Sequence, residues 1–508
     1  LFTTRERATG KSGVLDALDR LSDGVRKHLH EDPKDGPQRR LRVAEVFSPQ
    51  PEAWRRYAEG RRLFSEGRGT EARESYGRAI AADPGFPLAH LELAAAAEWN
   101  DDETKRRHLD AAVLGIERLP PKERLWAEAV RARLEFRLAD SIELCDRAIA
   151  GWPQDPRAYE EAAYVFTDIF ADLEGARPYV EKALALGALA PARAVHYLLH
   201  LGRLDEALAR ARRWADESPG RGSSASLSTV HRLRDEHAES LRVARLALSF
   251  DGSTPGWFDP LFWSFVEADA TDDLERHFAN ADKQSWMLLA LQGRRREALR
   301  TLDARAPPGS APASARGYHH ALRADYRWGD GDPELVWQEI VQEMILGVPT
   351  AMCGAQLLIS LGDVERGERI SSLFAISPDH TRMLCPKVAL HLGAWKRGDR
   401  DAAIRGLSAM AMPEATYHLG EVLAEAGRDA EAAEAFRKFR RWPEWDNNWA
   451  GIGAAYPLSL YREALSVERL GNREQALKLV DRLLLLWKRA DDLPALREAK
   501  ALRSRLSR

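Results

Sequence analysis

Two histidines in this sequence have the spacing of a metal-binding pair. His196 and His200 lie four positions apart on a predicted helix, so both imidazole rings are expected on one face of it. A zinc site needs three or four protein ligands. The sequence fixes no third ligand, and no glutamate lies between the histidines in a metalloprotease pattern. We therefore predict two structural histidines, no bound metal and no cofactor.

Two glycine-containing segments approach nucleotide-binding motifs, but each lacks a required part. Thr9–Ser12 reads as the end of a phosphate-binding loop, yet Arg5 stands where that motif has its first glycine. Gly220–Ala225 fits the dinucleotide fingerprint, but a predicted helix, not a strand, precedes it. We expect a glycine- and serine-rich loop over 219–228 and no catalytic residues. An enzyme with a site in the less regular region 220–320 remains a minor alternative.

Arginine clusters recur along the predicted helices and could line a groove for the acidic tail of a partner protein. A guanidinium group pairs bidentately with a carboxylate, which suits arginine to this task. Each cluster also has glutamate or aspartate nearby, as a solvated helix face would. Both interpretations apply to the clusters at Arg55–Arg56 with Arg61–Arg62, Arg210 with Arg212–Arg213, Arg294–Arg296, and Arg437–Arg441.

Three tryptophans close together form a second candidate contact for a partner. Trp442 is followed by Trp445 and Trp449, and the polar segment Asp446–Asn448 lies between Trp445 and Trp449. Exposed aromatic side chains beside polar residues can anchor a peptide. Packing across an irregular junction between repeats is the alternative.

The elements that would position these residues follow a repeat of about thirty-four residues, which predicts two antiparallel helices and a turn. Small residues lie where the helix backbones come closest, large apolar residues lie beside them, and a proline ends the unit. The first clear unit has Gly60, Leu63, Ala72, Tyr76, Ala79 and Pro84. A second unit repeats this order with Leu419, Gly420, Leu423, Ala432, Phe436 and Pro443.

Glycines mark the predicted turns between helices in the second half of the chain. A residue with φ > 0 commonly joins two antiparallel helices, and glycine adopts it without steric cost. We expect this role for Gly362, Gly398, Gly427 and Gly471. The sequence thus predicts an all-α, tetratricopeptide-like solenoid of about eleven or twelve helix pairs, wound as a right-handed superhelix.

We predict three regions in this solenoid. Residues 1–50 form a helical adaptor or the remnant of a preceding domain, with helices over 14–29 and 39–46. Residues 51–305 form a first block that becomes irregular from about 220. The proline-rich segment 306–312 is the best linker in the chain, and 315–508 forms a second block that ends in a capping helix.

Bulk composition limits the function classes. The chain has 508 residues, with 75 basic and 78 acidic side chains and a net charge of −3. This balance argues against general binding to nucleic acid or to an anionic membrane. No stretch has the roughly 18 apolar residues of a membrane span. Cys145, Cys353 and Cys385 form no paired motif, which favours the cytoplasm; an upstream anchor would favour an extracytoplasmic location.

Three stretches carry a resemblance to a known group of proteins: Ser48–Phe86, Leu119–Arg124 and Leu485–Pro494. They resemble the tetratricopeptide arrays at the carboxy-terminal end of bacterial serine/threonine protein kinases and of membrane-anchored transcription regulators. In that family the repeats are receptor or scaffold modules without catalysis. The chain has no kinase motif and begins with Leu1 instead of Met, so the resemblance implies the regulatory arm of a larger protein, or a stand-alone relative.

The leading hypothesis is a non-catalytic scaffold that binds a protein or peptide on the face formed by the first helix of each pair, in bacterial signalling or complex assembly. The alternative is a sensory arm of a kinase or regulator whose effector domain lies elsewhere. Oligomeric state does not follow from the residues. Our candidate partner-binding residues are Arg56, Arg62, His90, Glu160, Tyr164, Trp445 and Trp449.

Overall fold

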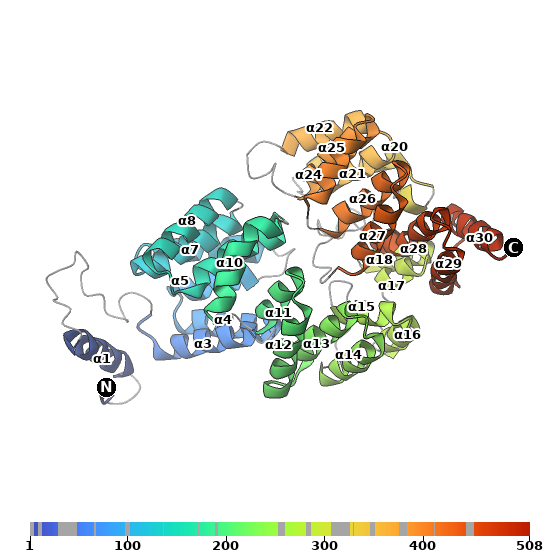
Figure 1. Cartoon of the computed structure of the whole chain (residues 1–508). Helices are drawn as coiled ribbons and strands as arrows, with labels where there is room; N and C mark the ends of the chain where they lie inside the picture. Colours follow the sequence, from blue (N-terminus) through green and yellow to red (C-terminus); the bar gives the residue numbers. More distant parts are fainter. Residues whose placement is uncertain are drawn as a thin grey trace. The chain divides into compact units, whose positions relative to one another are not determined.

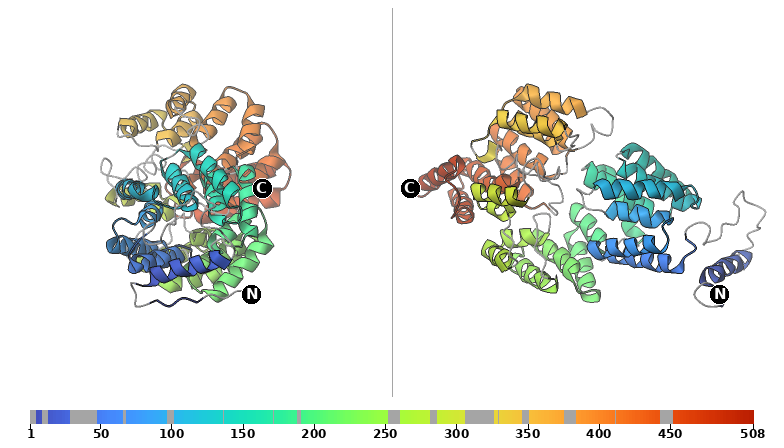
Figure 2. Two further views of the ribbon diagram at one scale, coloured as in Figure 1. Left: turned by 90° about the vertical axis from the view of Figure 1, so that its left-hand side faces the viewer. Right: turned by 180° about the vertical axis from the view of Figure 1, so that it is seen from behind.

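The computed structural model of the chain is all-helical over the part that it describes (Figure 1). This part comprises residues 5–8, 13–28, 48–65, 68–96, 102–135, 137–170, 172–187, 191–251, 260–280, 286–305, 326–328, 330–345, 351–374, 384–410, 412–442 and 452–508. It contains 27 α-helices and no strand. Consecutive helices pack on one another in pairs, as Figure 2 shows from two further directions. The predicted fold class is therefore confirmed.

The chain divides into two compact units. Unit 1 comprises Leu1–Val165 and Ala176–Ala194, and unit 2 comprises Phe166–Gly175 and Val195–Arg508. The helices up to residue 200 are α1 (Val14–His28), α3 (Pro51–Ser65), α4 (Gly69–Ala82), α5 (Pro87–Ala96), α6 (Asp102–Ile116), α7 (Pro121–Leu134), α8 (Leu138–Gly151), α9 (Pro156–Tyr164), the π-helix η1 (Val165–Ile169), α10 (Leu173–Ala185) and α11 (Pro191–His200).

The first helix of each pair in unit 1 begins at a proline. Pro51, Pro87, Pro121 and Pro156 are the first residues of α3, α5, α7 and α9. Proline suits this position because its fixed φ matches the helix and its missing N–H would have no partner in the first turn. These prolines therefore separate one repeat from the next.

The two helices of a repeat approach most closely where glycine meets an aromatic ring. A Cβ atom on Gly60 of α3 would lie 2.5 Å from the ring of Tyr76 on α4. In the equivalent repeat, a Cβ atom on Gly420 would lie 2.7 Å from the ring of Phe436. Both rings are fully buried. The predicted placement of small and aromatic residues in these repeats is confirmed.

The remaining helices continue the paired arrangement. They are α12 (Leu204–Glu217), α13 (Arg221–Leu233), α14 (His237–Asp251), α15 (Pro260–Glu267), α16 (Thr271–Asn280), α17 (Trp286–Leu291), α18 (Arg295–Arg305), the 3-10 helix η2 (Tyr326–Trp328), α20 (Pro333–Ile345), α21 (Ala351–Ser360), α22 (Val364–Phe374), α24 (Leu384–Lys396), α25 (Arg400–Ser408), α26 (Pro413–Glu425), α27 (Asp429–Arg440), α28 (Ile452–Arg469), α29 (Arg473–Leu486) and α30 (Pro494–Leu506). Gly362, Gly398, Gly427 and Gly471 all have positive φ between helices, as predicted.

Unit 2 departs from a simple array because its last repeats pack back on helices about 200 residues earlier. Arg232 of α13 is fully buried and donates hydrogen bonds to Glu267 at 2.9 Å and to the carbonyl oxygen of Trp442 at 2.8 Å. Arg441 in turn donates to the carbonyl oxygen of Leu233 at 2.5 Å. These bonds tie the end of α27 to α13.

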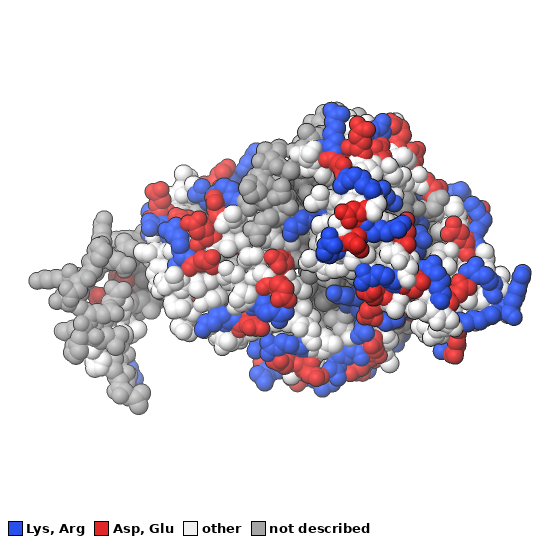
Figure 3. Space-filling model, turned by 45° about the horizontal axis from the view of Figure 1, so that its top comes forward, with Lys and Arg blue, Asp and Glu red and all other residues white. Residues whose placement is uncertain are grey.

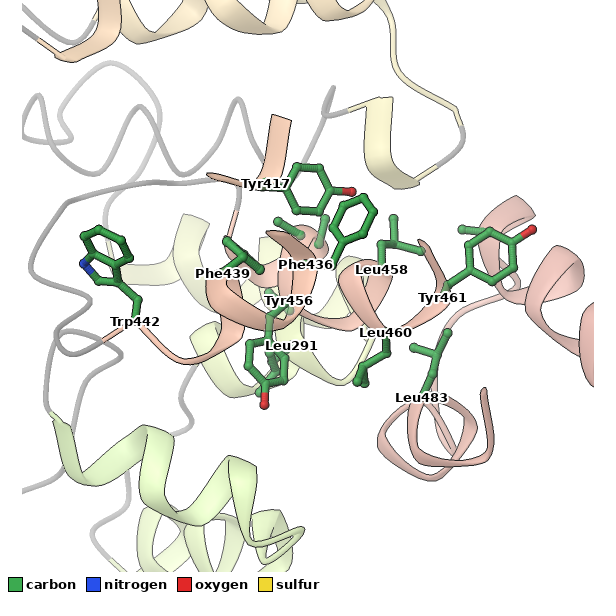
Figure 4. Close-up of a cluster of buried hydrophobic side chains, with 14 of the residues drawn as sticks. Leu291, Tyr417, Phe436, Phe439, Trp442, Tyr456, Leu458, Leu460, Tyr461 and Leu483 are labelled. Atoms are coloured by element: carbon green, nitrogen blue, oxygen red, sulfur yellow. The ribbon is translucent and has the colours of Figure 1, made fainter. Parts of the chain in front are cut away.

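A second set of contacts joins the turn after α29 to the turn after α17. The indole N–H of Trp487 donates to the carbonyl oxygen of Leu291 at 3.1 Å. The backbone N–H of Asp491 donates to the carbonyl oxygen of Gly293 at 3.0 Å, and the Asp491 carboxylate accepts from the backbone N–H of Arg296 at 2.8 Å. One hydrophobic cluster, seen in part in Figure 4, extends through these helices.

The prediction of a loop over 219–228 is wrong for most of that segment, because helix α13 begins at Arg221. Gly220 precedes the helix, and its backbone N–H donates to Ser223 Oγ at 3.1 Å. Ser228 is buried, and its Oγ lies 2.8 Å from Ser264 Oγ and 2.8 Å from the carbonyl oxygen of Ser240. Small hydroxyl side chains allow α13, α14 and α15 to pack closely, so tertiary packing overrides the local loop signal.

Several sequence predictions concern residues outside the described part of the chain. These are the helix over 39–46 and the linker at 306–312. The helix predicted over 14–29 is present as α1. Contacts within unit 2 join helices from both predicted blocks, and the boundaries 51–305 and 315–508 stay a prediction.

Replacing Gly293 with alanine tests the packing of the α29 turn on the α17 turn. Gly293 and Gly427 have nearly equal φ values, +72° and +74°. A Cβ atom at 293 would lie 2.6 Å from Ala490 Cβ, whereas one at 427 meets nothing within 4 Å. Gly427→Ala should lower the free energy of unfolding by about 1–2 kcal/mol through backbone strain. Gly293→Ala should lower it by about 1–3 kcal/mol more through overpacking.

Urea denaturation followed by circular dichroism measures both losses. The two glycines belong to the same unit, so each variant is the control for the other. Equal losses would contradict the packing of Ala490 on Gly293.

Candidate functional site

The first helices of the repeats in unit 1 form one continuous face. α5 contacts α7, and α7 contacts α9. Arg61 of α3 reaches past α5 and lies with its guanidinium carbon 5.9 Å from the centre of the Trp126 ring on α7. Side chains two repeats apart meet in this way on the inner side of a curved array. We call the surface of α3, α5, α7, α9 and the start of α11 the inner face.

Two aromatic rings on the inner face each lie close to two arginine side chains. The guanidinium carbons of Arg61 and Arg157 are 5.9 Å and 5.4 Å from the centre of the Trp126 ring. The guanidinium carbons of Arg133 and Arg193 are 4.9 Å and 5.1 Å from the centre of the Tyr164 ring. Distances below about 6 Å are typical of cation–π attraction. We call these six residues the arginine–aromatic ladder.

Carboxylates from neighbouring repeats neutralise the ladder. Arg61 pairs with Glu92 of α5 at 2.8 Å, and Arg133 pairs with Glu161 of α9 at 2.5 Å. The side chains of Arg133 and Glu161 are only 14% and 10% exposed, so water screens this pair little, whereas Glu92 is 13% exposed and its partner Arg61 40%. The pairs therefore hold the arginine side chains in fixed positions.

The other two arginines of the ladder, Arg157 and Arg193, also lie near carboxylates. Arg157 donates to Asp155 at 2.7 Å and lies 3.5 Å from Glu123. Arg193 lies 3.8 Å from Glu160, which is longer than a hydrogen bond. The Arg61 and Arg193 side chains, at the two ends of the ladder, are 40% and 26% exposed, compared with 14% for Arg133. Solvent therefore reaches Arg61 most easily, whereas Arg193 is little more exposed than Arg157, at 23%.

Burial changes the proton affinity of the carboxylates on this face. It raises the pKa of Glu160, against the opposing attraction of Arg193 and Arg61. It also raises the pKa of Glu92, against the attraction of Arg61. Asp155 shows the opposite shift, because hydrogen bonds from Arg157 and Lys122 outweigh burial and lower its pKa. The ionised form of Glu160 is thus less favourable in the folded protein than in the unfolded chain.

The structure places the predicted binding residues in different settings. Tyr164 belongs to the ladder, and Glu160 lies beside its Arg193. Arg56 pairs with Glu52 and Glu59 on its own helix, and Arg62 is exposed on α3.

His90 is buried inside its repeat. Its Nδ1 lies 2.9 Å from His108 Nδ1, and its Nε2 lies 3.0 Å from the carbonyl oxygen of Pro84. It therefore holds α5 to α6, and its predicted role in binding a partner stays a prediction. Trp445 and Trp449 lie outside the described residues; the neighbouring Trp442 is buried.

Sequence reasoning does not identify most of the ladder, although the sequence contains a signal for it. Arg61 and Glu92 are 31 residues apart, and Arg133 and Glu161 are 28 residues apart. Both separations are close to one repeat. Opposite charges that recur at the repeat length, beside aromatic residues on first helices, would have pointed to Arg61, Trp126, Arg133, Arg157 and Arg193.

The other candidate sites find no chemical role in the described residues. The rings of His196 and His200 are 4.5 Å apart, but no group of three metal-binding side chains occurs in the part of the chain that the structure describes. Thr9–Ser12 lies outside that part. A cavity near α16 has a volume of about 60 Å³, well below the roughly 300–1,000 Å³ of a site for a drug-sized molecule. No described helix is long and apolar enough to cross a membrane.

The arginine clusters are mostly engaged within the protein. Arg437 and Arg440 both pair with Glu463 of α28, and Arg294 pairs with Glu297 at 2.6 Å. Acidic and basic side chains interleave over the surface seen in Figure 3. The clusters therefore contribute ion pairs to the repeats, whereas on the inner face of unit 1 four arginines surround two rings within a few helices.

Comparison with known proteins identifies tetratricopeptide repeats at residues 57–104 and 390–444. Two segments of the chain are thus similar to tetratricopeptide repeats, and such repeats generally serve as protein-interaction scaffolds. No curated protein matches it. A solved structure described as "Crystal structure of APC/C hetero-tetramer Cut9-Hcn1" aligns with 98% of this chain and 83% of its own, at 12% identity and a TM-score of 0.33, too low to support an argument. The comparisons do not support the resemblance to bacterial kinases and regulators.

Glu160→Gln should stabilise the protein at neutral pH but not in acid. The folded-state pKa of Glu160 is raised by burial above the unfolded value, so its ionisation opposes folding once the pH rises above about 4.3. Glutamine carries no charge and escapes this penalty. The variant should unfold a few degrees higher than the wild type at pH 7, and the difference should vanish near pH 4.

Thermal unfolding at the two pH values measures this difference. Glu74→Gln is the matched control, because Glu74 is 60% exposed on the second helix α4 and should change the unfolding temperature little. A gain of the same size at both pH values would show that the charge of Glu160 is not its cause.

Proposed function

We propose that this protein is a non-catalytic scaffold whose inner face in unit 1 binds an acidic segment of a partner protein. The observation that carries the proposal is the ladder, in which each of two aromatic rings has two arginine side chains within 6 Å of its centre. The general role of tetratricopeptide repeats in protein interaction supports a protein partner. Charged residues presented in fixed geometry suit recognition of carboxylates.

The internal ion pairs leave capacity for a partner. Arg61 uses Nη1 for Glu92, and Arg133 uses Nε for Glu161. A guanidinium group has five N–H donors, so these bonds leave further donors on both side chains. The glutamates fix each guanidinium group before a partner arrives, which reduces the entropy lost on binding. An acidic peptide would then place carboxylates beside the ends of the ladder, at Arg61 and Arg193.

A second, more specific proposal is that this chain regulates a kinase or transcription regulator of which it is a part. It is based on the resemblance of the segment Leu485–Pro494 to such proteins. In the structure, Trp487 and Asp491 of this run contact Leu291 and Gly293. A structural role therefore accounts for these two residues. Determining the coding sequence upstream of Leu1 tests the proposal, because an effector domain there would support it and an immediate start codon would refute it.

Binding of a labelled oligoglutamate peptide tests the scaffold proposal. We expect saturable binding to the wild-type protein at low salt, measured by fluorescence anisotropy. Arg193→Gln should weaken binding about tenfold, because a hydrogen bond to a charged group contributes about 1.5–3 kcal/mol. Glu160→Gln should strengthen it by removing a like charge from the same face.

Arg78→Gln is the matched control for Arg193→Gln. Arg78 lies on the second helix α4, is 57% exposed and pairs with Glu74 on its own helix. Its loss should leave the affinity unchanged. Equal weakening by the two variants, or binding of oligolysine as tight as that of oligoglutamate, would reject the inner face as an acidic-segment site.

A further inference from the structure

Two histidines between helices α5 and α6 form a buried pair. His90 of α5 and His108 of α6 are 7% and 9% exposed, and their ring centres lie 5.1 Å apart. Their Nδ1 atoms are 2.9 Å apart, which is hydrogen-bond distance. His90 Nε2 also lies 3.0 Å from the carbonyl oxygen of Pro84, and His108 Nε2 lies 3.3 Å from Arg107 Nη2. Four groups thus form one chain of polar contacts across the repeat.

The chemistry at the two ends of this chain fixes where the protons lie. The carbonyl oxygen of Pro84 can only accept a hydrogen bond, so His90 Nε2 carries a proton. In the neutral ring His90 Nδ1 is then an acceptor, and His108 Nδ1 must donate to it. This leaves His108 Nε2 as an acceptor, which matches the guanidinium group of Arg107, a donor only. Both ends therefore require the same arrangement, with one proton on each ring.

A further proton meets a donor on either ring. On His90 Nδ1 it would face the N–H of His108, and on His108 Nε2 it would face the guanidinium group of Arg107. If His108 moves its own proton to Nε2 instead, the contact with Arg107 is lost. Protonation therefore costs at least one bond of the chain, at a place where burial leaves little water to replace it.

The surroundings of His90 favour the neutral ring on balance. Burial has the largest effect and lowers the pKa of His90, and Arg107 of α6 lowers it further. The hydrogen bond to Pro84 and the charge of Asp83, in the turn before α5, raise this pKa but do not outweigh burial. Arg118, which follows α6, donates to a backbone carbonyl of the same turn at 3.4 Å and adds a second cation there. Helix α7 also packs on α5, and none of its described residues contributes to the shift.

The free energy of unfolding should accordingly fall in acid. A histidine of the unfolded chain takes up a proton near pH 6.5, whereas His90 in the folded chain stays neutral to a lower pH. Between these two values the unfolded chain binds more protons than the folded one. The stabilisation present at pH 7 is therefore lost as the pH falls.

We propose that the His90–His108 pair is a pH-sensitive joint, which holds α5 to α6 at neutral pH and loosens in mildly acidic solution. Helix α5 also carries Glu92, which pairs with Arg61 at 2.8 Å, so loosening of α5 would disturb this contact of the inner face as well. The joint needs no partner protein, and it stands independently of the binding of an acidic segment.

Nitrogen-15 NMR of protein labelled at histidine tests the arrangement of the protons. The shifts of imidazole nitrogens distinguish the two neutral tautomers and the charged ring. We expect His90 as the Nε2–H tautomer at pH 7, with a titration midpoint below about 6.5. Arg107→Gln should raise this midpoint by a few tenths of a pH unit, because it removes a neighbouring cation. Arg106→Gln is the matched control, since Arg106 is exposed on the same helix, and it should leave the midpoint unchanged.

Hydrogen exchange of the full chain at pH 7 and pH 5, corrected for the intrinsic pH dependence of exchange, tests the loosening. Amides of α5 and α6 should lose about tenfold in protection at pH 5 relative to α7 and α8, which contain no histidine, because one pKa unit corresponds to a factor of ten. The double variant His90→Gln/His108→Gln keeps donors and acceptors but does not titrate in this range. It should lose no protection in α5 and α6 between the two pH values.

Three results would overturn the proposal. They are a titration midpoint of His90 at or above about 6.5, the Nδ1–H tautomer of His90 at pH 7, and a loss of protection in α5 and α6 no larger than in α7 and α8. The first two are measured on the wild-type protein, so they hold even if the double variant does not fold.

Discussion

The close crossing of the two helices in each repeat is the constraint on which the structure depends. Gly60 meets the ring of Tyr76, and Gly420 meets the ring of Phe436, at distances that leave no space for a Cβ atom. This contact fixes the separation of the paired helices, so the first helices of successive repeats lie along one side. Side chains on that side must then satisfy each other across repeats. The pairing of Arg61 with Glu92 and of Arg133 with Glu161 follows from this geometry.

Unit 2 uses the same repeats but closes on itself. The end of a repeat array exposes an apolar helix face that needs a cover. In unit 2, buried Arg232 bonds to Trp442, and Trp487 bonds to Leu291, so distant repeats cover one another. A contact of this kind brings polar groups of unrelated segments together.

The repeats could be predicted from the sequence because each spans about thirty-four residues and depends on local spacing. The binding face could not, since successive residues on a helix point about 100° apart. Arg61 joins the ladder while Arg62 is exposed, and no local pattern separates these neighbours. The helix at 221–233 and the contacts of Asp491 with Gly293 depend on residues far apart in the chain. Local composition therefore predicted a loop where packing forms a helix.

Hydrogen exchange with and without oligoglutamate tests most directly whether the inner face of unit 1 is the binding surface. The account predicts slower amide exchange in the first helices α7 and α9, which carry Trp126 and Tyr164, and no change in the second helices α4 and α8. Protection confined to the second helices or to unit 2 would contradict it.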